Sequence, residues 1–578
     1  MGITDNDKII RVNMAGLSTL VEDFPKKWKL LGGRALSSNI LLNECDPTCD
    51  PLGPGNVLVI APGVLSGTTA PTSGRLSVGC KSPLTGGIKE ANAGGNPGQD
   101  LMKLGYRAII VKEQPADKEK RWGLVVNEEG ISLKQADDYK GLWNYANCEK
   151  LLADAPKSAS AISIGPAGEM MLKSASVACT DSDKERRPAR HAARGGIGAV
   201  MGSKCLKWIL VDPGKLPTRK PSDSKAFAVF HKSFSKDYLV TRHDKFKGTS
   251  AVIPVANMLN TFPYKNRTSG SNPEFEKLDG ARIYESFEER GGEMHACMNG
   301  CIVKCSNAVN DKDGNHLTSA LEFETLTLLG SNCAINDWEK VAVLDRLCDE
   351  LGMDTIEIGG AIAVLMDAGG MEWGDAEAVT KLLREDIAGG TELGKTVGNG
   401  AVSVGKSKNH ERVPAIKNQT VPAWDPRPLK ATGVTYAISP MGADHTAGLV
   451  IDTQIGGEAA VAASQAAQIN CAVIDTYGFC MFLRPSIDET RQFLSHFLGE
   501  EISNEQIADI GWQCLEEEWE FNEKAGLTDA DDDIPACLRE EGVGPDQLLM
   551  FDVPTDLIAK AKKRMPASEG FYKADGTG

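Results

Sequence analysis

Three cysteines at four-residue intervals constrain the fold of this chain more than any other feature. They lie in Cys297-Met-Asn-Gly-Cys301-Ile-Val-Lys-Cys305. Positions i, i+4 and i+8 share a helix face, so a helix could present all three thiols, and a wrapped loop could do the same. Three close thiols suit three corners of a cubane iron–sulfur cluster, whereas a zinc site normally shows two separated pairs. The trio therefore predicts a cluster whose fourth ligand comes from elsewhere in the chain.

The remaining cysteines carry a weaker signal. Cys45-Asp-Pro-Thr-Cys49 repeats the four-residue step with only two thiols, and its Asp and Pro favour an ordinary turn over a metal site. The chain has 15 cysteines, an odd number, and its N-terminus has no apolar signal-peptide core. We therefore expect a cytoplasmic protein whose cysteines are thiols or metal ligands rather than disulfides.

Charge and length exclude several classes of partner. The 578 residues carry a net charge of −16, which argues against nucleic acid or an anionic membrane as the partner. No apolar run approaches the roughly 20 residues of a membrane span. A chain of this length is expected to form three or four domains of about 150 residues each.

The apolar pattern changes once along the chain. Residues 1–212 show buried-strand patterns separated by turns rich in Gly, Pro, Ser and Thr. These patterns cover 56–61, 108–111, 124–126, 161–164 and 208–211. A linker rich in Pro and Lys follows at 213–221, and helical spacing dominates beyond it. We expect an α+β fold with a β-rich domain (1–212) and two mainly helical domains (213–415 and 416–578), ending in a loose tail at 566–578.

Three loops in the β-rich domain are typical of backbone that binds phosphate. They are Pro-Thr-Ser-Gly-Arg at 71–75, Lys-Glu-Ala-Asn-Ala-Gly-Gly at 89–95, and the Arg- and Gly-rich segment 190–204. Glycine lets backbone N–H groups approach an anion closely, and arginine adds a bidentate donor. Each loop alone fits ordinary turns better. Three in one domain, together with an iron–sulfur signature, favour a large phosphorylated cofactor.

Two helices are expected to meet at a glycine. Apolar residues over 336–351 have helical spacing, Asn336 and Glu339 predict a capping box at the start, and Gly352 ends the helix. Asp354 and Glu357 predict a second capping box for the helix that starts at once.

An acidic pair flanks this corner. Asp349 lies in the last turn of the first helix, where a carboxylate opposes the helix dipole at a cost of a few tenths of a kcal/mol, roughly. A solvated surface acid is the ordinary explanation of Asp349, and N-capping explains Asp354. Both acids could nevertheless face one buried polar ligand, because the corner is tight.

Together these segments resemble the tungsten-containing aldehyde:ferredoxin oxidoreductase family over nearly the whole chain. The matching segments are Gly-Gly-Arg-Ala-Leu at 32–36, 71–75, Lys-Ser-Pro-Leu-Thr-Gly at 81–86, 91–95, 193–204, the cysteine trio, Asp-Glu-Leu-Gly-Met-Asp-Thr at 349–355 and Asp-Thr-Tyr-Gly-Phe-Cys at 475–480. The last segment resembles the family element that supplies the fourth cluster ligand, which points to Cys480, with Cys471 as the second choice. The three-residue gap between the first two cysteines, and the segments 425–427 and 433–445, resemble the bacterial branch.

The resemblance implies a tungsten ion held by two pterins (tungstopterin), one [4Fe–4S] cluster and a magnesium ion. The cluster ligands implied are Cys297, Cys301, Cys305 and Cys480, and the magnesium ligands are the backbone carbonyls of Asn92 and Ala192. The implied cofactor-binding residues are Arg75, Asn92, Ala93, Gly94, Gly95, Arg194, Gly195, Asp349, Met353, Asp354, Thr355, Asp475 and Phe479. Within this set, Asp349 and Asp354 would bind one pterin and Asp475 the other. The β-rich domain would thus be the pterin-binding domain.

Two residues are implied to act beside the metal. Glu324 would be the general base that activates water or the aldehyde hydrate, and His445 would donate a hydrogen bond to the carbonyl or a metal oxo group. Without the resemblance, a surface acid and a core histidine would explain both residues. Glu322 is the rival base, because it lies one strand period away.

The implied activity is the reversible oxidation of an aldehyde to a carboxylic acid. Electrons would pass from tungsten through the cluster to a ferredoxin or polyferredoxin-like subunit, with a flavin subunit needed for any NAD activity. One alternative is a related subunit that reduces an aromatic acyl-CoA ring. The other is a non-catalytic iron–sulfur electron-transfer protein, which would contain iron and sulfide but neither tungsten nor pterin.

Overall fold

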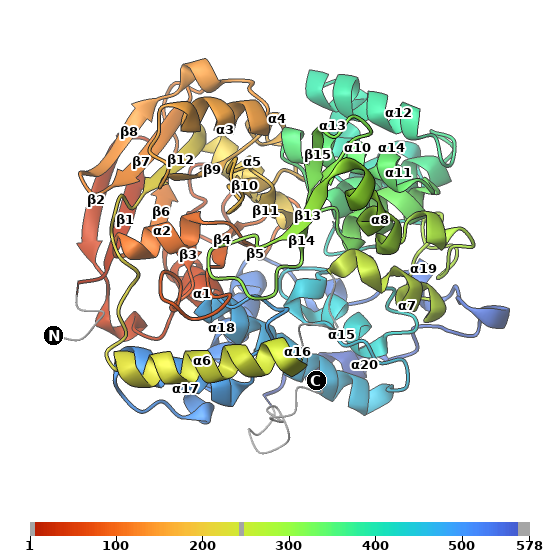
Figure 1. Cartoon of the computed structure of the whole chain (residues 1–578). Coiled ribbons are helices and arrows are strands. Elements are labelled where there is room, and N and C mark those ends of the chain that lie inside the picture. The colour runs from red at the N-terminus through yellow and green to blue at the C-terminus, as the bar shows by residue number, and fades with distance from the viewer. Residues whose placement is uncertain (1–5, 242–247, 565–578) are drawn as a thin grey trace.

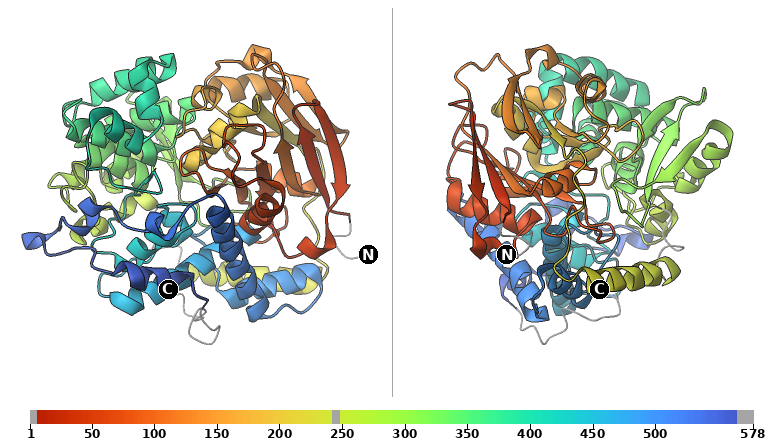
Figure 2. Two further views of the ribbon diagram at one scale, coloured as in Figure 1. Left: turned by 180° about the vertical axis from the view of Figure 1, so that it is seen from behind. Right: turned by 60° about the vertical axis from the view of Figure 1, so that its left-hand side comes forward.

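The computed structural model describes residues 6–241 and 248–564, so the predicted loose tail at 566–578 lies outside the described residues. Figure 1 shows two sheets in red to orange on one side, green helices on the other, and blue C-terminal helices beneath both. The view from behind in Figure 2 shows the same three groups. The expected α+β class, β-rich first and mainly helical afterwards, is confirmed. Within the described ranges, no helix combines the length and the apolarity that crossing a bilayer requires.

The first sheet has six strands in the order β2-β1-β6-β3-β4-β5. The strands are β1 (Lys8–Asn13), β2 (Ser18–Asp23), β3 (Leu58–Pro62), β4 (Leu76–Lys81), β5 (Ile88–Ala93) and β6 (Tyr106–Lys112). All pairs are antiparallel except β1 and β6. Every residue of β3 and β4 is buried, because helix α1 (Gly33–Glu44) covers one face and the second sheet the other.

The second sheet also has six strands, in the order β11-β10-β9-β12-β7-β8. They are β7 (Trp122–Asn127), β8 (Gly130–Gln135), β9 (Ser160–Ser163), β10 (Val177–Cys179), β11 (Arg190–Ala192) and β12 (Leu206–Asp212). One apolar core, which includes Ile60, Val111, Ile162 and Ile209, joins the two sheets. The five strand patterns of the sequence correspond to β3, β6, β7, β9 and β12. The edge strands β5 and β11 are in contact, so Asn92 and Ala192 lie on adjoining sheet edges.

The remaining elements are mainly helical. The further helices are α2 (Pro97–Lys103), α3 (Asn144–Ala153), α4 (Pro166–Glu169), α5 (Ile197–Ser203), α6 (Ser224–Thr241), α7 (Ile253–Met258), α8 (Gly280–Arg290), α9 (Phe323–Thr325), α10 (Trp338–Leu351), α11 (Thr355–Asp367), α12 (Ala376–Lys381), α13 (Glu392–Gly398), α14 (Ala401–Lys408), α15 (Lys430–Ile438), α16 (Gly457–Tyr477), α17 (Ile487–Leu498), α18 (Asn504–Lys524), α19 (Ala536–Arg539) and α20 (Thr555–Ile558). The small strands are β13 (Gly292–His295), β14 (Ser306–Asn310), β15 (His316–Ser319), β16 (Ala415–Ile416) and β17 (Gln419–Thr420). The domain boundaries at 212/213 and 415/416 stay predictions.

The C-terminal helices pack directly on the N-terminal sheet. Arg34 of α1 is fully buried and makes a bidentate ion pair with Glu518 of α18, at 2.9 and 2.7 Å. Helix α16 lies beside both helices and ends at Gly478, whose φ is +83°. Gly33 has φ +43°, and a Cβ there would lie 1.9 Å from the carbonyl oxygen of Asp475. The Gly-Gly-Arg segment of the sequence therefore allows α1 to approach the end of α16 closely.

The helix corner is present, but two predicted capping boxes are wrong. Helix α10 is capped by Asp337, whose carboxylate accepts from the N–H groups of Glu339 and Lys340, while the Asn336 side chain bonds Glu274 instead. Gly352 ends α10 at φ +73°, and Asp354 caps α11, as predicted. Glu357 does not return to the cap, because its carboxylate binds the backbone N–H groups of Ala401 and Thr420.

Replacing the true cap should weaken this corner. Asp337→Ala leaves two N-terminal N–H groups of α10 without an acceptor, so we expect a loss of about 1 kcal/mol of unfolding free energy. Asp337→Ser retains an accepting oxygen and should change stability by only a few tenths of a kcal/mol, roughly. Denaturant unfolding of both variants beside the wild type measures the difference. Equal stability of the alanine and serine variants would contradict the assignment.

Candidate functional site

The cysteine trio lies in a loop, not on a helix. Residues 296–305 connect β13 to β14 without helical structure, which settles the alternative that the spacing alone left open. Cys297 and Cys301 are 8% and 7% exposed, and Cys480, just after α16, is 6% exposed. Cys305 is half-buried. The trio and Cys480 belong to one buried cluster, so the chain brings together cysteines that are 175 residues apart (480 − 305).

Thr72 fixes the trio loop relative to Cys480. The N–H of Cys480 donates to the carbonyl of Thr72 at 3.1 Å, and the N–H of Thr72 donates to that of Gly300 at 3.0 Å. The Thr72 hydroxyl accepts from the N–H of Ile302 at 3.0 Å. These bonds hold the loop and Cys480 on either side of the 71–75 segment. That segment therefore positions the thiols as well as bearing Arg75.

The surroundings raise the pKa of Cys297, Cys305 and Cys480, whereas contact with Cys297 lowers the pKa of Cys301. Burial raises the pKa of Cys305 well above that of a free thiol, and the charges of Glu322, Cys480 and Cys297 raise it further. Burial also raises the pKa of Cys480, against the opposing charge of Arg75. Within the described residues, no three His, Cys, Asp or Glu side chains converge on a single ion. A cubane does not require such convergence, because its cysteines bind different irons.

Strand β5 leads into a glycine pair that touches the cysteine loop. The N–H of Gly95 donates to the carbonyl of Cys297 at 3.1 Å, and a Cβ on Gly94 would lie 3.0 Å from the Cys297 sulfur. Gly95 has φ +93°, which favours glycine. The Arg75 guanidinium donates to the side-chain oxygen of Asn92 and, at 3.3 Å, to its carbonyl. Four predicted residues, Arg75, Asn92, Gly94 and Gly95, thus surround one spot beside the trio.

Arg190, the first residue of the predicted phosphate-binding segment 190–204, also reaches this spot. Its Nε lies 2.9 Å from Asp181, which also contacts His295 at 3.0 Å, and its Nη2 donates to Ser306 at 2.8 Å. Asp181 and Cys297 raise its pKa, although burial alone would lower it. Arg190 belongs to the Arg- and Gly-rich segment 190–204, so the signal was present in the sequence. Its partners were not, because they come from loops and strands elsewhere.

Asp349 has an unsatisfied oxygen. The side chain is 11% exposed, its Oδ1 lies 3.2 Å from Nε2 of His191, and its Oδ2 is buried without a hydrogen-bond partner. Buried carboxylate oxygens normally have partners. A buried acceptor without a partner fits a ligand-binding role of Asp349, and its burial excludes a solvated surface acid.

Asp354 and Arg194 are bound to each other. Arg194 Nε donates to Asp354 at 3.1 Å, its Nη2 donates to the carbonyl of Thr420 at 2.6 Å, and its Nη1 donates to that of Ala443. Asp354 also caps α11. All three guanidinium nitrogens therefore have protein acceptors. The phosphate-binding role of Arg194 stays a prediction, and it requires a phosphate to replace some of these acceptors.

Asp475 lies near Arg34, with 4.0 Å between its Oδ2 and the guanidinium Nη1. Burial raises its pKa well above the usual range, and the charge of Glu90 raises it further, while Arg34 and Arg75 oppose both. The Nη1 of Arg34 and one oxygen of Glu90 are buried without partners. These unpartnered atoms come from α1 and β5 and form a second group, separate in sequence from Asp349.

The other predicted residues contribute backbone or packing. Met353 bridges Ala175 in antiparallel fashion, and the hydroxyls of Thr355 and Thr325 are 2.9 Å apart. Gly195 has φ +82°, and a Cβ there would lie 2.5 Å from the side chain of Lys89. Phe479 is fully buried and packs on Phe493, with ring centroids 5.6 Å apart. The roles of these residues, and of Ala93 and Ala192, stay predictions.

Glu324 and His445 face each other. One oxygen of Glu324 accepts from the N–H of Ala423 at 2.7 Å. The other lies 3.6 Å from Nδ1 of His445, and both of these atoms are buried without a hydrogen-bond partner. At 3.6 Å the two atoms are too far apart to hydrogen-bond each other, and a third polar atom that bonds both would have to lie to one side of the line between them.

Glu322 has a different environment. It is half-buried, accepts a hydrogen bond from Thr249 at 3.3 Å and lies 3.8 Å from Arg190. Burial raises its pKa, with Arg190 and Arg75 opposing. Its charge acts on Cys305, whereas Glu324 faces His445. The two candidate bases therefore have different direct contacts, although the charge of His445 also acts on Glu322.

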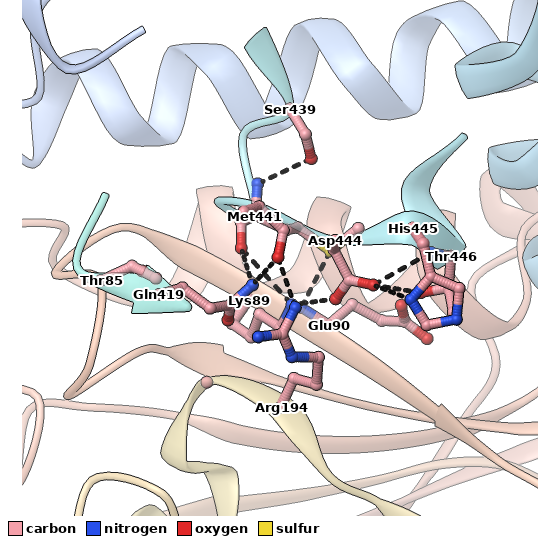
Figure 3. A network of polar contacts seen from close by, with 12 residues as sticks. Thr85, Lys89, Glu90, Arg194, Gln419, Ser439, Met441, Asp444, His445 and Thr446 are labelled. Carbon is pink, nitrogen blue, oxygen red and sulfur yellow. Dashed lines mark hydrogen bonds and ion pairs between the residues drawn. The ribbon is translucent and has the colours of Figure 1, made fainter. Parts of the chain in front are cut away.

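The loop that carries His445 is anchored by buried cations, as Figure 3 shows. Lys89 of β5 is fully buried and donates to Asp444 at 2.7 Å, and Asp444 accepts from the N–H of Thr446 at 3.0 Å. Burial alone would raise the pKa of Asp444, but the charges of Lys89 and Arg194 outweigh it and hold the pKa well below its usual range. Lys89 therefore ties the strand that leads to Gly94 to the loop that presents His445.

Removing this anchor should be costly. Lys89→Met leaves the Asp444 carboxylate buried without its ion pair, so we expect a loss of about 3 kcal/mol of unfolding free energy. Lys29→Met removes a cation from an exposed pair with Glu500, whose side chains are 36% and 44% exposed, and should cost at most about 1 kcal/mol. Denaturant unfolding compares the variants. Equal losses would show that the Lys89–Asp444 pair is not a stabilising anchor.

Comparisons with known proteins follow the same division of the chain. The family model described as "Aldehyde ferredoxin oxidoreductase, N-terminal domain" matches residues 9–213, and the model described as "Aldehyde ferredoxin oxidoreductase, domains 2 & 3" matches residues 225–562. The tungsten-containing aldehyde ferredoxin oxidoreductase of Pyrococcus furiosus is 32% identical, over 92% of this chain and 91% of that protein. The protein of the same name from Thermococcus kodakarensis is also 32% identical, with the same coverage.

Two more distant relatives complete the comparison. The "Aliphatic sulfonate oxidoreductase, WOR-like subunit" of Pyrococcus furiosus is 27% identical over 86% of this chain and 82% of that protein. The solved active-site complex BamBC of benzoyl coenzyme A reductase, with 1,5-dienoyl-CoA, superposes with a TM-score of 0.78 over 97% of this chain and 94% of that chain, at 17% identity. That likeness shows a shared fold. On the family models and the curated relatives, this chain is a member of the aldehyde ferredoxin oxidoreductase family, a family of oxidoreductase enzymes.

Proposed function

We propose that the chain oxidises aldehydes to carboxylic acids, reversibly, and passes the electrons through a [4Fe–4S] cluster to a ferredoxin-like acceptor. The observation that carries this proposal is the facing pair of Glu324 and His445, with two buried unpartnered atoms 3.6 Å apart. In this arrangement, Glu324 can take a proton from a substrate oxygen bound beside the pair, and the His445 ring nitrogen can donate a hydrogen bond to a substrate oxygen. Family membership supports the redox chemistry.

The residues present fit the cofactors that the family implies. Asp349 offers a buried oxygen without a partner. Because Gly94 and Gly95 have no side chains, their backbone beside Arg75 stays open to a ligand. These residues, with Asn92, Asp354 and Asp475, would hold the tungsten pterins and their magnesium ion. The buried thiols of Cys297, Cys301 and Cys480, and the half-buried thiol of Cys305, would hold the cluster. When bound, the tungsten centre accepts two electrons and the cluster transfers them singly.

The chain itself moves the proton. Glu324 Oε2 is fixed by the N–H of Ala423, which leaves Oε1 free to take a proton from water or the aldehyde hydrate. His445 is fixed from behind, because Asp444 begins its turn and is anchored by Lys89. From there its ring can donate a hydrogen bond to the carbonyl oxygen. The side chains of His445 and Glu324 are 17% and 15% exposed, and this partial burial strengthens both interactions.

Metal analysis followed by assay tests the proposal. Protein produced with tungstate should contain iron and tungsten in a ratio of four to one and should oxidise acetaldehyde or benzaldehyde with a viologen dye as acceptor. Iron and sulfide without tungsten would instead indicate an electron-transfer protein. Full metal loading without aldehyde oxidation, but with reduction of an aromatic acyl-CoA, would favour the chemistry named for the structural neighbour.

The proposed partner is an electron carrier of the ferredoxin or polyferredoxin type. The trio loop lies near the surface, since Asn299, Gly300 and Lys304 are exposed while the thiols beside them are largely buried. A carrier that docks over this loop would shorten the path from the cluster. Any transfer to NAD would need a further flavin subunit.

A further inference from the structure

A second pair of cysteines lies apart from the site. Cys45 directly follows α1 and Cys49 follows one turn later, and their sulfurs are 4.0 Å apart. Cys45 is 4% exposed and Cys49 is half-buried, so one thiol is reachable from solvent and the other lies behind it. Neither belongs to the buried cluster that contains the trio and Cys480.

Two lysines, Lys81 and Lys204, lie within electrostatic reach of this pair. Lys81 donates to the carbonyl oxygens of Cys49, at 2.8 Å, and Pro47, at 2.5 Å. Lys204 is fully buried, and its ammonium donates to the carbonyl of Asn56 at 2.5 Å. Burial lowers the pKa of Lys204 to about 8, while the charges of Cys45 and Cys80 act against that shift. A thiolate beside these ammonium groups would offset part of the cost of burying them.

The two thiols are unequal. Contact with Cys45 lowers the pKa of Cys49 to about 7, burial opposes the shift, and Lys81 and Lys204 favour it. Contact with Cys49 and burial both raise the pKa of Cys45. Thiol–disulfide exchange needs an accessible thiolate that attacks and a neighbouring thiol that resolves. Cys49 has the properties of the attacking thiol, and Cys45 those of the resolving thiol.

A metal ion is a poorer explanation of the pair. In the parts of the chain that the structure describes, no third His, Cys, Asp or Glu joins Cys45 and Cys49 to make a site for an ion. Two thiols alone are too few for a structural zinc site, which takes four ligands. The segment is a turn, as its Asp and Pro predicted, and the N–H of Cys49 donates to the carbonyl of Asp46 at 3.0 Å.

We propose that Cys45 and Cys49 are a reversible dithiol–disulfide site that reacts with low-molecular-weight disulfides such as oxidised glutathione. The Cys49 thiolate attacks one glutathione sulfur, which breaks the glutathione disulfide, forms a mixed disulfide and releases one glutathione thiolate. Cys45 then gives up its proton, attacks the Cys49 sulfur and releases the second glutathione. In total, two protein thiols are oxidised and one glutathione disulfide is reduced to two thiols.

The geometry favours a reversible bond. For the bond to form, the sulfurs must close from 4.0 Å to about 2.05 Å. The loop that the bond would close is short, so its effect on the unfolded chain is small. A half-exposed disulfide of this kind is readily reduced again. The site does not depend on the proposed aldehyde chemistry.

Mass spectrometry of the holoenzyme tests this proposal. After exposure to oxidised glutathione at pH 7 and alkylation of the remaining thiols, the peptide with Cys45 and Cys49 should lack two hydrogens and carry no alkyl group. Cys537, a half-buried cysteine without a neighbouring thiol in the described structure, is the internal control. Cys49 should react about tenfold faster than Cys537, because contact with Cys45 lowers the pKa of Cys49, whereas burial raises that of Cys537.

Single variants separate the two roles. In Cys45→Ser the glutathione adduct should accumulate on Cys49, because no thiol resolves it, and in Cys49→Ser residue 45 should react about tenfold more slowly than Cys49 does in the wild type. Complete alkylation of both cysteines in the treated wild type would overturn the proposal, and so would a stable adduct on wild-type Cys49. Iron content is measured in parallel, so that loss of the cluster is not mistaken for reaction at this pair.

Discussion

Glu324→Gln is expected to lower kcat for aldehyde oxidation by about 10²- to 10⁴-fold while tungsten and iron contents stay unchanged. The substitution keeps the size of the side chain and an oxygen that can accept from the N–H of Ala423. It removes the basic oxygen that faces His445 across 3.6 Å. Because only proton transfer is lost, we expect kcat to fall much more than KM rises. Steady-state kinetics with a viologen acceptor and metal analysis of the same samples measure both effects.

Glu322→Gln is the matched control, two residues away in the same segment. Glu322 contacts Thr249 and Arg190 and acts electrostatically on Cys305, so its loss should affect the cluster side of the site more than proton transfer. We expect at most about a tenfold loss of kcat, well below the range for a lost general base. If Glu322→Gln lowered kcat more than Glu324→Gln does, Glu322 would be the base. Full activity of Glu324→Gln would remove Glu324 from that role.

Local sequence signals predicted five of the strands and the two helices α10 and α11, with small errors at their ends, and left the other elements unassigned. The five strand patterns were found because β3, β6, β7, β9 and β12 are fully or largely buried runs of apolar residues. The cap of α10 was placed one residue early, because Asn336 and Asp337 are both good caps and the apolar spacing fits either. Only the bond between Asn336 and Glu274, 62 residues earlier, decides between them.

Tertiary partners could not be predicted in this way. Glu357 has the right spacing for a capping box but is drawn to the N–H groups of Ala401 and Thr420, at least 44 residues away. Lys89 and Asp444 are 355 residues apart, and no periodicity or motif links them. Family resemblance supplied the candidates Asp349, Glu324 and His445, but it did not supply their unpartnered atoms. Those follow from how the segments pack.

The choice between Cys480 and Cys471 as the fourth cluster ligand leads to a second prediction with a large expected effect. Cys480 acts on the pKa of Cys301 and Cys305, so it lies within electrostatic reach of the trio. Cys471 lies nine residues earlier on α16, and the charges that act on it are those of Asp475, Arg34, Arg484 and Asp444 rather than the trio. The structure therefore favours Cys480 as the fourth ligand on grounds that are independent of the sequence motif.

Cys480→Ala should abolish the cluster, whereas Cys471→Ala should leave it intact. Both substitutions shorten a cysteine of the same C-terminal region to alanine, and Cys480→Ala keeps the backbone bond to Thr72. A cubane normally needs four thiolates, so we expect iron and acid-labile sulfide in Cys480→Ala to fall to a small fraction of the wild-type content, and the low-temperature EPR signal of the reduced cluster to disappear. Dye-linked aldehyde oxidation should fall with them, because the path for electrons is lost. Wild-type iron in Cys480→Ala, or equal iron loss in both variants, would show that the fourth ligand lies elsewhere; iron loss in Cys471→Ala alone would assign it to Cys471.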